Sequence, residues 1–276
     1  MLPDALTRSD PTLGRKLVII KLGATFPYLA AKHGDFEDWI LGRMGLRRQD
    51  APVIDPTAGQ MLPPLDAIAG AVITGSHAMV TDRATWSERT AAWLREAVDF
   101  GLPVLGICYG HQLLAYALGG IVEDNPRGWE FGTVTTTLTT SAQADPLLGG
   151  LGEAIEVQTS HTQSVTRLPS GARLFACSEK DPHLAYGIGD RVWGVQFHPE
   201  FDACVVRAYV EATRAGLVAQ GQDPDAILRG VRETPSGHRI LRRFARLVLA
   251  PQGRPLAEDR AGRDRQPILA TRGKHA

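Results

Sequence analysis

Short runs of β-branched and apolar residues alternate with helical patterns over the first 120 residues, and this alternation constrains the fold more than any other feature. The predicted strands lie at residues 16–23, 51–56, 67–75 and 102–107. Stretches with apolar residues at helical spacing lie at residues 36–46, 87–101 and 111–120. Strands that alternate with helices are typical of a parallel sheet with helices on both faces.

The second half of the chain has a different character. Its short, β-rich segments are separated by turn residues and predict further strands, partly antiparallel, the last of them at residues 192–197. Helical patterns follow at residues 203–220 and 225–250. We therefore predict, in chain order, a loose lead-in at 1–15, an α/β domain at 16–215, a helical extension at 216–250 and a mobile tail at 251–276.

Composition and charge exclude several classes of protein. The 276 residues are 43% hydrophobic and 22% charged, with a formal net charge of +0, so no overall field attracts nucleic acid or an anionic membrane. Cys108, Cys177 and Cys204 are too widely spaced for a disulfide framework or a zinc site, and we interpret the last two as core or helix thiols. No signal peptide or membrane span is evident in the sequence, so we expect a cytoplasmic protein.

Cys108 stands where a predicted strand turns into a predicted helix, between Gly106 and Gly110. A strand, a Gly-x-Cys-x-Gly turn and a helix are the parts of a nucleophile elbow, in which glycines let the strand and the helix approach closely. The helix N-terminus also favours a thiolate. The alternative interpretation is a buried core thiol without chemistry.

His198 and Glu200 follow the last predicted strand and are separated by Pro199. In extended structure, residues two apart point to the same side, so both side chains can stand together above the end of the sheet. A thiol, a histidine and a carboxylate supply a nucleophile, its base and the group that orients the base. The alternatives are a surface histidine at a strand end and a glutamate in the first turn of a helix.

Two segments together, GICYGHQLLAYALGG (106–120) and GVQFHPEF (194–201), resemble the class I, or triad, glutamine amidotransferase family. The likeness is nearest to the glutaminase domain of GMP synthase and to its stand-alone relatives, which VIIKLGATFPYLAAKHGDFEDWI (18–40) also resembles. It covers roughly residues 16–215. The resemblance implies a three-layer, flavodoxin-like α/β sandwich with a mostly parallel sheet, here followed by a C-terminal helical extension.

The resemblance also implies catalytic roles. Cys108 would attack the side-chain amide of glutamine and form a γ-glutamyl thioester. His198 would be the general acid and base, and Glu200 would orient it. The backbone N–H groups of Gly75 and Tyr109 would form the oxyanion hole.

The residues that the resemblance assigns to substrate binding are Gln112, Ser160, His161 and Thr162. The sequence departs from the family at Gln163, where an acidic residue is common, and at Thr74 and Ser76, where glycine and proline are usual. These departures leave the substrate open, since a lost acidic contact would weaken recognition of the α-amino group of free glutamine.

Several other residues near these motifs receive structural interpretations. We expect His77, His111 and His161 to be structural or lining residues, because the family uses only one histidine for acid and base chemistry. We expect Glu130 to be a surface carboxylate. The arginine-rich run at 242–246 is interpreted as a solvated helix face, with a partner-docking face as the alternative.

Three functions remain open. The first is a glutaminase that supplies ammonia to an acceptor on a partner synthetase subunit, because the chain has neither an SGGVDS loop nor a P-loop. The second is a stand-alone γ-glutamyl hydrolase or peptidase, and the third is a non-catalytic regulatory protein on the same fold. The resemblance implies no metal and no organic cofactor, and no nucleic-acid or membrane partner is expected.

Overall fold

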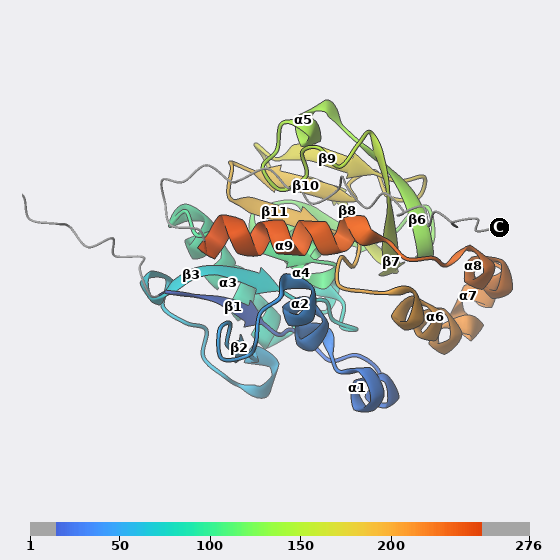
Figure 1. Ribbon diagram of the computed structural model, residues 1–276, viewed down its shortest axis with the longest axis horizontal. Coiled ribbons are helices and arrows are strands. Elements are labelled where there is room, and N and C mark those ends of the chain that lie inside the picture. The colour runs from blue at the N-terminus through green and yellow to red at the C-terminus, as the bar shows by residue number, and fades with distance from the viewer. Residues whose placement is uncertain (1–14, 250–276) are drawn as a thin grey trace, which may run out of the picture.

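A nine-stranded sheet lies between two layers of helices in the computed structural model, which describes residues 15–249 (Figure 1). The predicted mobile tail and nearly all of the predicted lead-in lie outside the described residues. In sheet order the strands are β2 (Val53–Ile54), β1 (Lys16–Ile20), β3 (Ile68–Ile73), β4 (Val104–Ile107), β11 (Val192–Val195), β10 (Ala185–Ile188), β9 (Arg173–Cys177), β6 (Glu130–Leu138) and β7 (Ala154–His161).

The sheet has a parallel part and an antiparallel part. Strands β2, β1, β3, β4 and β11 run parallel to one another, whereas β10, β9, β6 and β7 are joined by antiparallel pairing. A separate antiparallel ribbon is made by β5 (Ile121–Asp124) and β8 (Gln163–Arg167). The predicted mixed, mostly parallel α/β sheet is therefore confirmed, and the central strand β4 carries the predicted nucleophile at its carboxyl end.

Alternating side chains of the strands build the two halves of the core. Along β1, Leu17 and Ile19 join one apolar cluster, while Val18 and Ile20 join the cluster on the opposite face. The first cluster is covered by α2 and α9, and the second by α3 and α4. The four covering helices are α2 (Phe36–Met44), α9 (Pro235–Leu249), α3 (Thr85–Asp99) and α4 (Tyr109–Ala117).

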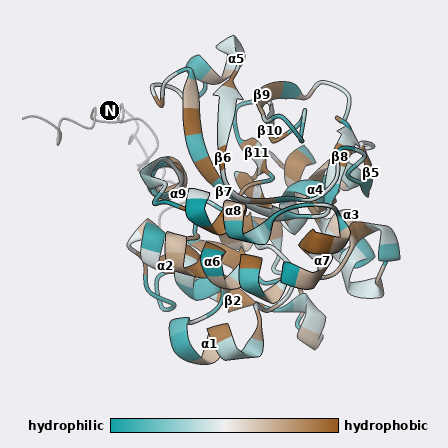
Figure 2. Ribbon diagram, turned by 90° about the vertical axis from the view of Figure 1, so that its right-hand side faces the viewer, coloured by the Kyte–Doolittle hydropathy of each residue, from teal (hydrophilic) through white to brown (hydrophobic). Residues whose placement is uncertain are grey.

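A third apolar cluster lies beyond the carboxyl ends of the parallel strands, under a group of short helices (Figure 1). These are α1 (Pro27–His33), α6 (Ala203–Ala212), α7 (Arg214–Ala219) and α8 (Pro224–Gly230). Figure 2, which faces them, shows hydrophobic and hydrophilic segments side by side on α6 and α7, as expected for helices with one buried face. The short elements that remain are α5 (Thr140–Gln143), η1 (Pro56–Ala58), η2 (Leu65–Ala67) and η3 (Val80–Asp82).

The predicted helix at residues 203–220 is divided into α6 and α7. The break falls at Thr213, whose backbone is not helical and whose hydroxyl donates to the carbonyl oxygen of Tyr209 at 2.7 Å. Beyond it, Trp129 packs directly on Gly216, where a Cβ atom would lie 2.4 Å from the indole ring. Between residues 15 and 249, every helix falls short of the length and apolarity that a membrane span requires.

Candidate active site

Cys108 occupies a strained turn between β4 and α4. Its φ of 50° and ψ of −102° lie outside the regions that a residue with a side chain normally adopts. A Cβ atom on Gly106 would lie 2.5 Å from the carbonyl oxygen of Gly110, and one on Gly110 would lie 2.5 Å from that of Ile73. The two glycines are therefore required by close backbone approach, and the turn has the geometry of a nucleophile elbow.

His198 and Glu200 lie next to this turn because β11 pairs with β4 in parallel register. Nδ1 of His198 donates to Oε1 of Glu200 at 2.7 Å, and both side chains are buried. The backbone N–H of His198 donates to the backbone carbonyl oxygen of Gln158 at 2.8 Å. Burial lowers the pKa of His198, but interactions with Glu200 and Cys108 outweigh it and raise the pKa to about 10. The imidazole is therefore charged at neutral pH and close enough to the thiol to interact with it.

Aromatic rings hold the His198 imidazole in place. The ring of Phe201 is stacked on it at 4.0 Å between centroids, and that of Phe36 lies nearly parallel at 6.1 Å. Gly75 adjoins the same imidazole, since a Cβ atom there would lie 3.1 Å from Cε1 of His198. Any side chain at that position would press on the ring, so the strand end that carries Gly75 contacts the histidine directly.

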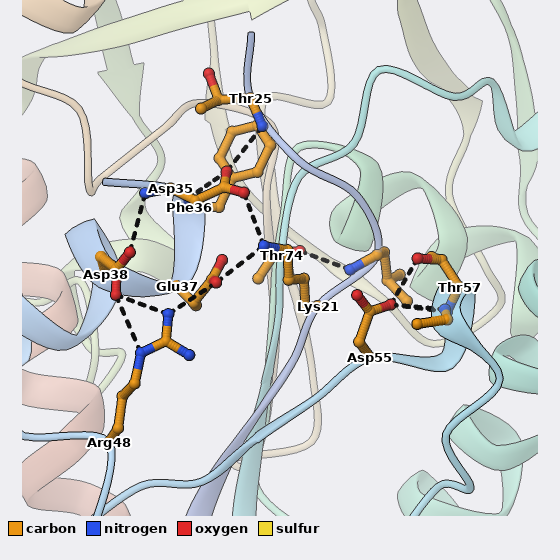
Figure 3. A network of polar contacts seen from close by, with 12 residues as sticks. Lys21, Thr25, Asp35, Phe36, Glu37, Asp38, Arg48, Asp55, Thr57 and Thr74 are labelled. Carbon is orange, nitrogen blue, oxygen red and sulfur yellow. Dashed lines mark hydrogen bonds and ion pairs between the residues drawn. The ribbon is translucent and has the colours of Figure 1, made fainter. Parts of the chain in front are cut away.

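A buried polar network fixes Phe36 at the start of α2 (Figure 3). Nζ of Lys21 contacts Asp35 at 2.7 Å and Glu37 at 2.9 Å. Oδ1 of Asp35 accepts from the backbone N–H groups of Phe36 and Thr25, each at 2.8 Å. Burial lowers the pKa of Lys21, but its two carboxylate partners raise it, so the ammonium keeps its charge. The network thereby positions one of the two rings beside His198.

Most of the predicted site residues line one pocket of about 280 Å³. They are Cys108, Tyr109, Gln112, Ser160, His161 and Thr162. The Sγ atom of Cys108 lies 3.9 Å from the carbonyl oxygen of Ser160. His77 also lines the pocket, and its Nε2 lies 3.2 Å from the hydroxyl of Tyr209.

Sequence reasoning missed another part of the pocket wall. Phe26 comes from the segment before α1, Tyr209 comes from α6, and Thr213 is the residue that ends α6. Tyr209 and Thr213 are four residues apart, so the sequence alone indicates that they share one side of a helix. Which way that face points depends on the packing of α6, and no local pattern gives it.

The side-chain amide of Gln163 donates hydrogen bonds to two neighbouring oxygen atoms. Its Nε2 donates to Oγ1 of Thr81 at 2.8 Å and to Oδ1 of Asp124 at 3.1 Å. A carboxylate at this position would face the Asp124 carboxylate, whereas an amide can donate to it. The backbone carbonyl of Gln163 accepts from Nε2 of Gln112 at 2.8 Å, so this residue also orients the predicted substrate-binding glutamine.

The departures at the start of the predicted oxyanion loop have a structural reason as well. Oγ1 of Thr74 accepts from the backbone N–H of Leu22 at 2.9 Å and donates to the carbonyl of Gly75 at 3.0 Å. Ser76 packs on Gly23, where a Cβ atom would lie 2.6 Å from the serine hydroxyl. The loop is thus fixed to the segment that follows β1 by a hydrogen bond and by close packing.

The prediction that Glu130 is a surface carboxylate is wrong. The residue is 4% exposed, and its Oε2 lies 3.1 Å from Nε2 of His161. Glu130 lies opposite His161 in the antiparallel pairing of β6 with β7, so the two side chains meet inside the protein. Oε1 of Glu130 accepts from the hydroxyl of Ser178 at 2.7 Å. The sequence contains no local signal for the register that makes this pair.

The remaining predictions concern residues outside the pocket. His111 is fully buried against Gly194, and burial lowers its pKa to about 3, so it is a neutral structural residue. Cys204 is an exposed thiol on α6, and Cys177 is a half-buried thiol at the end of β9. The run at 242–246 has one solvated and one buried side, since Phe244 is in the core. Within residues 15–249 no cluster of three histidine, cysteine or acidic side chains could hold a metal ion.

Comparison with known proteins identifies relatives of this fold and site. The family model described as glutamine amidotransferase class-I matches residues 51–208. The GMP synthase [glutamine-hydrolyzing] of Aeropyrum pernix is 32% identical over 185 residues, which are 67% of this chain and 32% of that protein. The enzyme of the same name from Symbiobacterium thermophilum is 46% identical over 103 residues, 37% of this chain and 20% of that protein.

A solved structure extends the likeness over most of the chain. The crystal structure of a glutamine amidotransferase from Methylobacillus flagellatus is 25% identical with a TM-score of 0.70, and the match covers 85% of this chain and 95% of that one. The curated relatives are much longer proteins, and this chain spans only between a fifth and a third of their length.

Proposed function

The chain belongs to the class I glutamine amidotransferase family, and from this premise we propose that it is a glutaminase with a Cys108, His198 and Glu200 triad. The single observation that supports this most strongly is the union of two distant motifs. The elbow of Cys108 and the hydrogen-bonded pair of His198 and Glu200 meet at the ends of the adjacent strands β4 and β11.

In the proposed reaction, His198 already carries the proton of the Cys108 thiol, and the Cys108 sulfur attacks the side-chain amide carbon of glutamine. The oxyanion that forms is stabilised by the backbone N–H groups of Gly75 and Tyr109. Protonated His198 then gives the proton to the departing nitrogen, so that ammonia leaves and a γ-glutamyl thioester remains. Water, deprotonated by His198, cleaves the thioester to glutamate and releases the Cys108 sulfur, which leaves the proton on His198 as at the start. Glu200 keeps the imidazole oriented throughout.

Binding of the amino-acid end is assigned to the side of the pocket formed by Gln112 and the backbone of residues 160–162. Gln112 is fixed there by two hydrogen bonds from its Nε2, to the carbonyl of Gln163 and to Oε1 of Gln196 at 3.0 Å. His198 lies next to Gly75 and interacts with Cys108, so it can protonate the departing nitrogen.

The fate of the ammonia is a further part of the proposal. We propose that an acceptor on a partner subunit uses it, because the relatives named GMP synthase contain long segments that this chain does not match. A second candidate, a γ-glutamyl hydrolase, is favoured by the pocket wall. Phe26 and Tyr209 extend it beyond Cys108 and offer contact area for a leaving group larger than ammonia.

The test is to incubate the purified chain with glutamine and, separately, with a γ-glutamyl dipeptide, and to measure ammonia and glutamate. Cys108→Ala, checked by circular dichroism for an unchanged fold, is the control. We expect ammonia from glutamine that depends on Cys108. Turnover of the dipeptide alone would establish the γ-glutamyl hydrolase instead. Absence of turnover with both substrates, together with no labelling of Cys108 by a glutamine-like electrophile, would refute both enzymatic functions.

A further inference from the structure

His161 is a second buried histidine beside Cys108, and both of its ring nitrogens face hydrogen-bond acceptors. Nδ1 lies 3.0 Å from the backbone carbonyl oxygen of Gln163, and Nε2 lies 3.1 Å from Oε2 of Glu130. A carbonyl oxygen and an ionised carboxylate can only accept hydrogen bonds. A neutral imidazole has a single N–H, so satisfying both contacts requires the doubly protonated ring.

The surroundings favour the ionised form of both partners. Oε1 of Glu130 accepts from the Ser178 hydroxyl, whose oxygen in turn accepts from the backbone N–H of Asp181 at 2.9 Å. Burial raises the pKa of Glu130, but His161 and the charge of Lys180 lower it, with a net shift below the usual value. Burial lowers the pKa of His161, whereas Glu130 and the buried Asp181 raise it, with a net upward shift. The other group that faces this imidazole from α4 is neutral His111.

The ion pair is oriented with its positive end toward the nucleophile. His161 lines the pocket together with Cys108, whereas Glu130 lies behind it on β6 and is not part of the pocket wall. Cys108 interacts electrostatically with His161. The thiol is therefore exposed mainly to the cationic half of the pair.

We propose that His161 is a positioning residue that Glu130 holds as an imidazolium, and that its fixed charge stabilises negative charge on Sγ of Cys108 without taking part in proton transfer. It cannot serve as the acid or base, because both N–H groups are directed to acceptors other than the thiol. The inference rests on the proposed function, in which the Cys108 sulfur is the nucleophile.

The first experiment measures the protonation of His161 in the unaltered protein. Correlation spectra of the histidine rings, recorded on ¹⁵N-labelled full-length chain at pH 7.5, distinguish imidazolium from either neutral tautomer. We expect His161 and His198 to be doubly protonated. The His161→Gln variant assigns its signal. A singly protonated His161 would overturn the proposal.

The second experiment measures the charge that the Cys108 sulfur experiences. Iodoacetate and iodoacetamide alkylate thiols with similar chemistry but differ by one negative charge, so the ratio of their rates reports the local potential. We expect His161→Gln to lower this ratio at Cys108 by about 3- to 10-fold, the effect of one partly compensated charge at an effective dielectric constant of about 20. An unchanged ratio would contradict the proposal even if the variant had lost activity.

Two controls separate electrostatics from structural damage. Cys204, exposed on α6, is alkylated in the same samples, and peptide mass spectrometry should give it the same ratio in every variant. Ser178→Ala removes a hydrogen bond to Glu130 but keeps both charges, so it should leave the ratio at Cys108 unchanged. Neither measurement needs glutamine turnover. A chain that lacks glutaminase activity but shows the imidazolium would refute the proposed function and leave this charge assignment standing.

Discussion

Two histidine–carboxylate pairs are buried beside Cys108, and they differ in what their second ring nitrogen contacts. His198 uses one nitrogen for Glu200 and leaves the other for the thiol. His161 uses one nitrogen for Glu130 and the other for a backbone carbonyl. A carboxylate partner alone therefore does not enable a histidine to act as a general acid or base. A free nitrogen near the reacting atom is also required, and only the first pair has one.

The largest expected effect comes from removing each imidazole in turn. His198→Asn should lower kcat for ammonia release from glutamine by about 1,000-fold, because the group that carries the proton is lost. His161→Asn should lower it by only about 10-fold, because a fixed charge is lost but proton transfer persists. Initial rates of ammonia release measure both. Equal losses would show that the two histidines do not differ in role.

Removing each carboxylate sharpens the same comparison. Glu200→Gln should lower kcat by about 100-fold, because the imidazolium loses the charged acceptor that orients it and supports its charge. Glu130→Gln should lower kcat by less than about 10-fold, since its partner does not exchange protons. The measurement is kcat under saturating glutamine. A greater loss at Glu130 than at Glu200 would reverse the assignment.

The contribution of the pair of His161 and Glu130 to the free energy of unfolding can be measured. His161→Leu should lower the free energy of unfolding by about 3–5 kcal/mol, because it leaves the Glu130 carboxylate buried without its charged partner. The double variant His161→Leu/Glu130→Leu should recover at least half of that loss. Urea denaturation followed by fluorescence gives both values. A double variant as unstable as the sum of the singles would mean that the two residues are not coupled.

The smallest effect is the pH dependence of the first pair. The pKa of His198 is raised to about 10, so its stabilising contribution is complete below about pH 6.5 and is lost as pH rises through about 10. Activity should accordingly stay nearly constant from pH 7 to 9 and fall toward pH 10. The free energy of unfolding should drop more between pH 7 and 10 in the wild type than in His198→Asn. An equal drop in both would assign the pH effect to other groups.

Sequence predicted the parts of the site that are encoded within a few consecutive residues. The turn around Cys108 depends on the two neighbouring glycines, and the first histidine–carboxylate pair lies in one extended segment. The strand and helix alternation likewise predicted the sheet and its layers. The pair of His161 and Glu130 could not be predicted, because it depends on the register between β6 and β7. The contribution of Tyr209 to the pocket depends in the same way on how α6 packs.

The parallel pairing of β4 with β11 has a consequence for synthesis of the protein in the cell. The strand that carries Cys108 emerges from the ribosome long before the strand that delivers His198, and Val104 meets Val192 only after most of the chain has been made. Until that closure, the Cys108 thiol lacks its base, so the proposed reaction with glutamine cannot occur. Local opening of β11 in the folded protein would likewise separate His198 from Cys108. During refolding, the time at which the proposed glutaminase activity appears would therefore report when β11 pairs with β4.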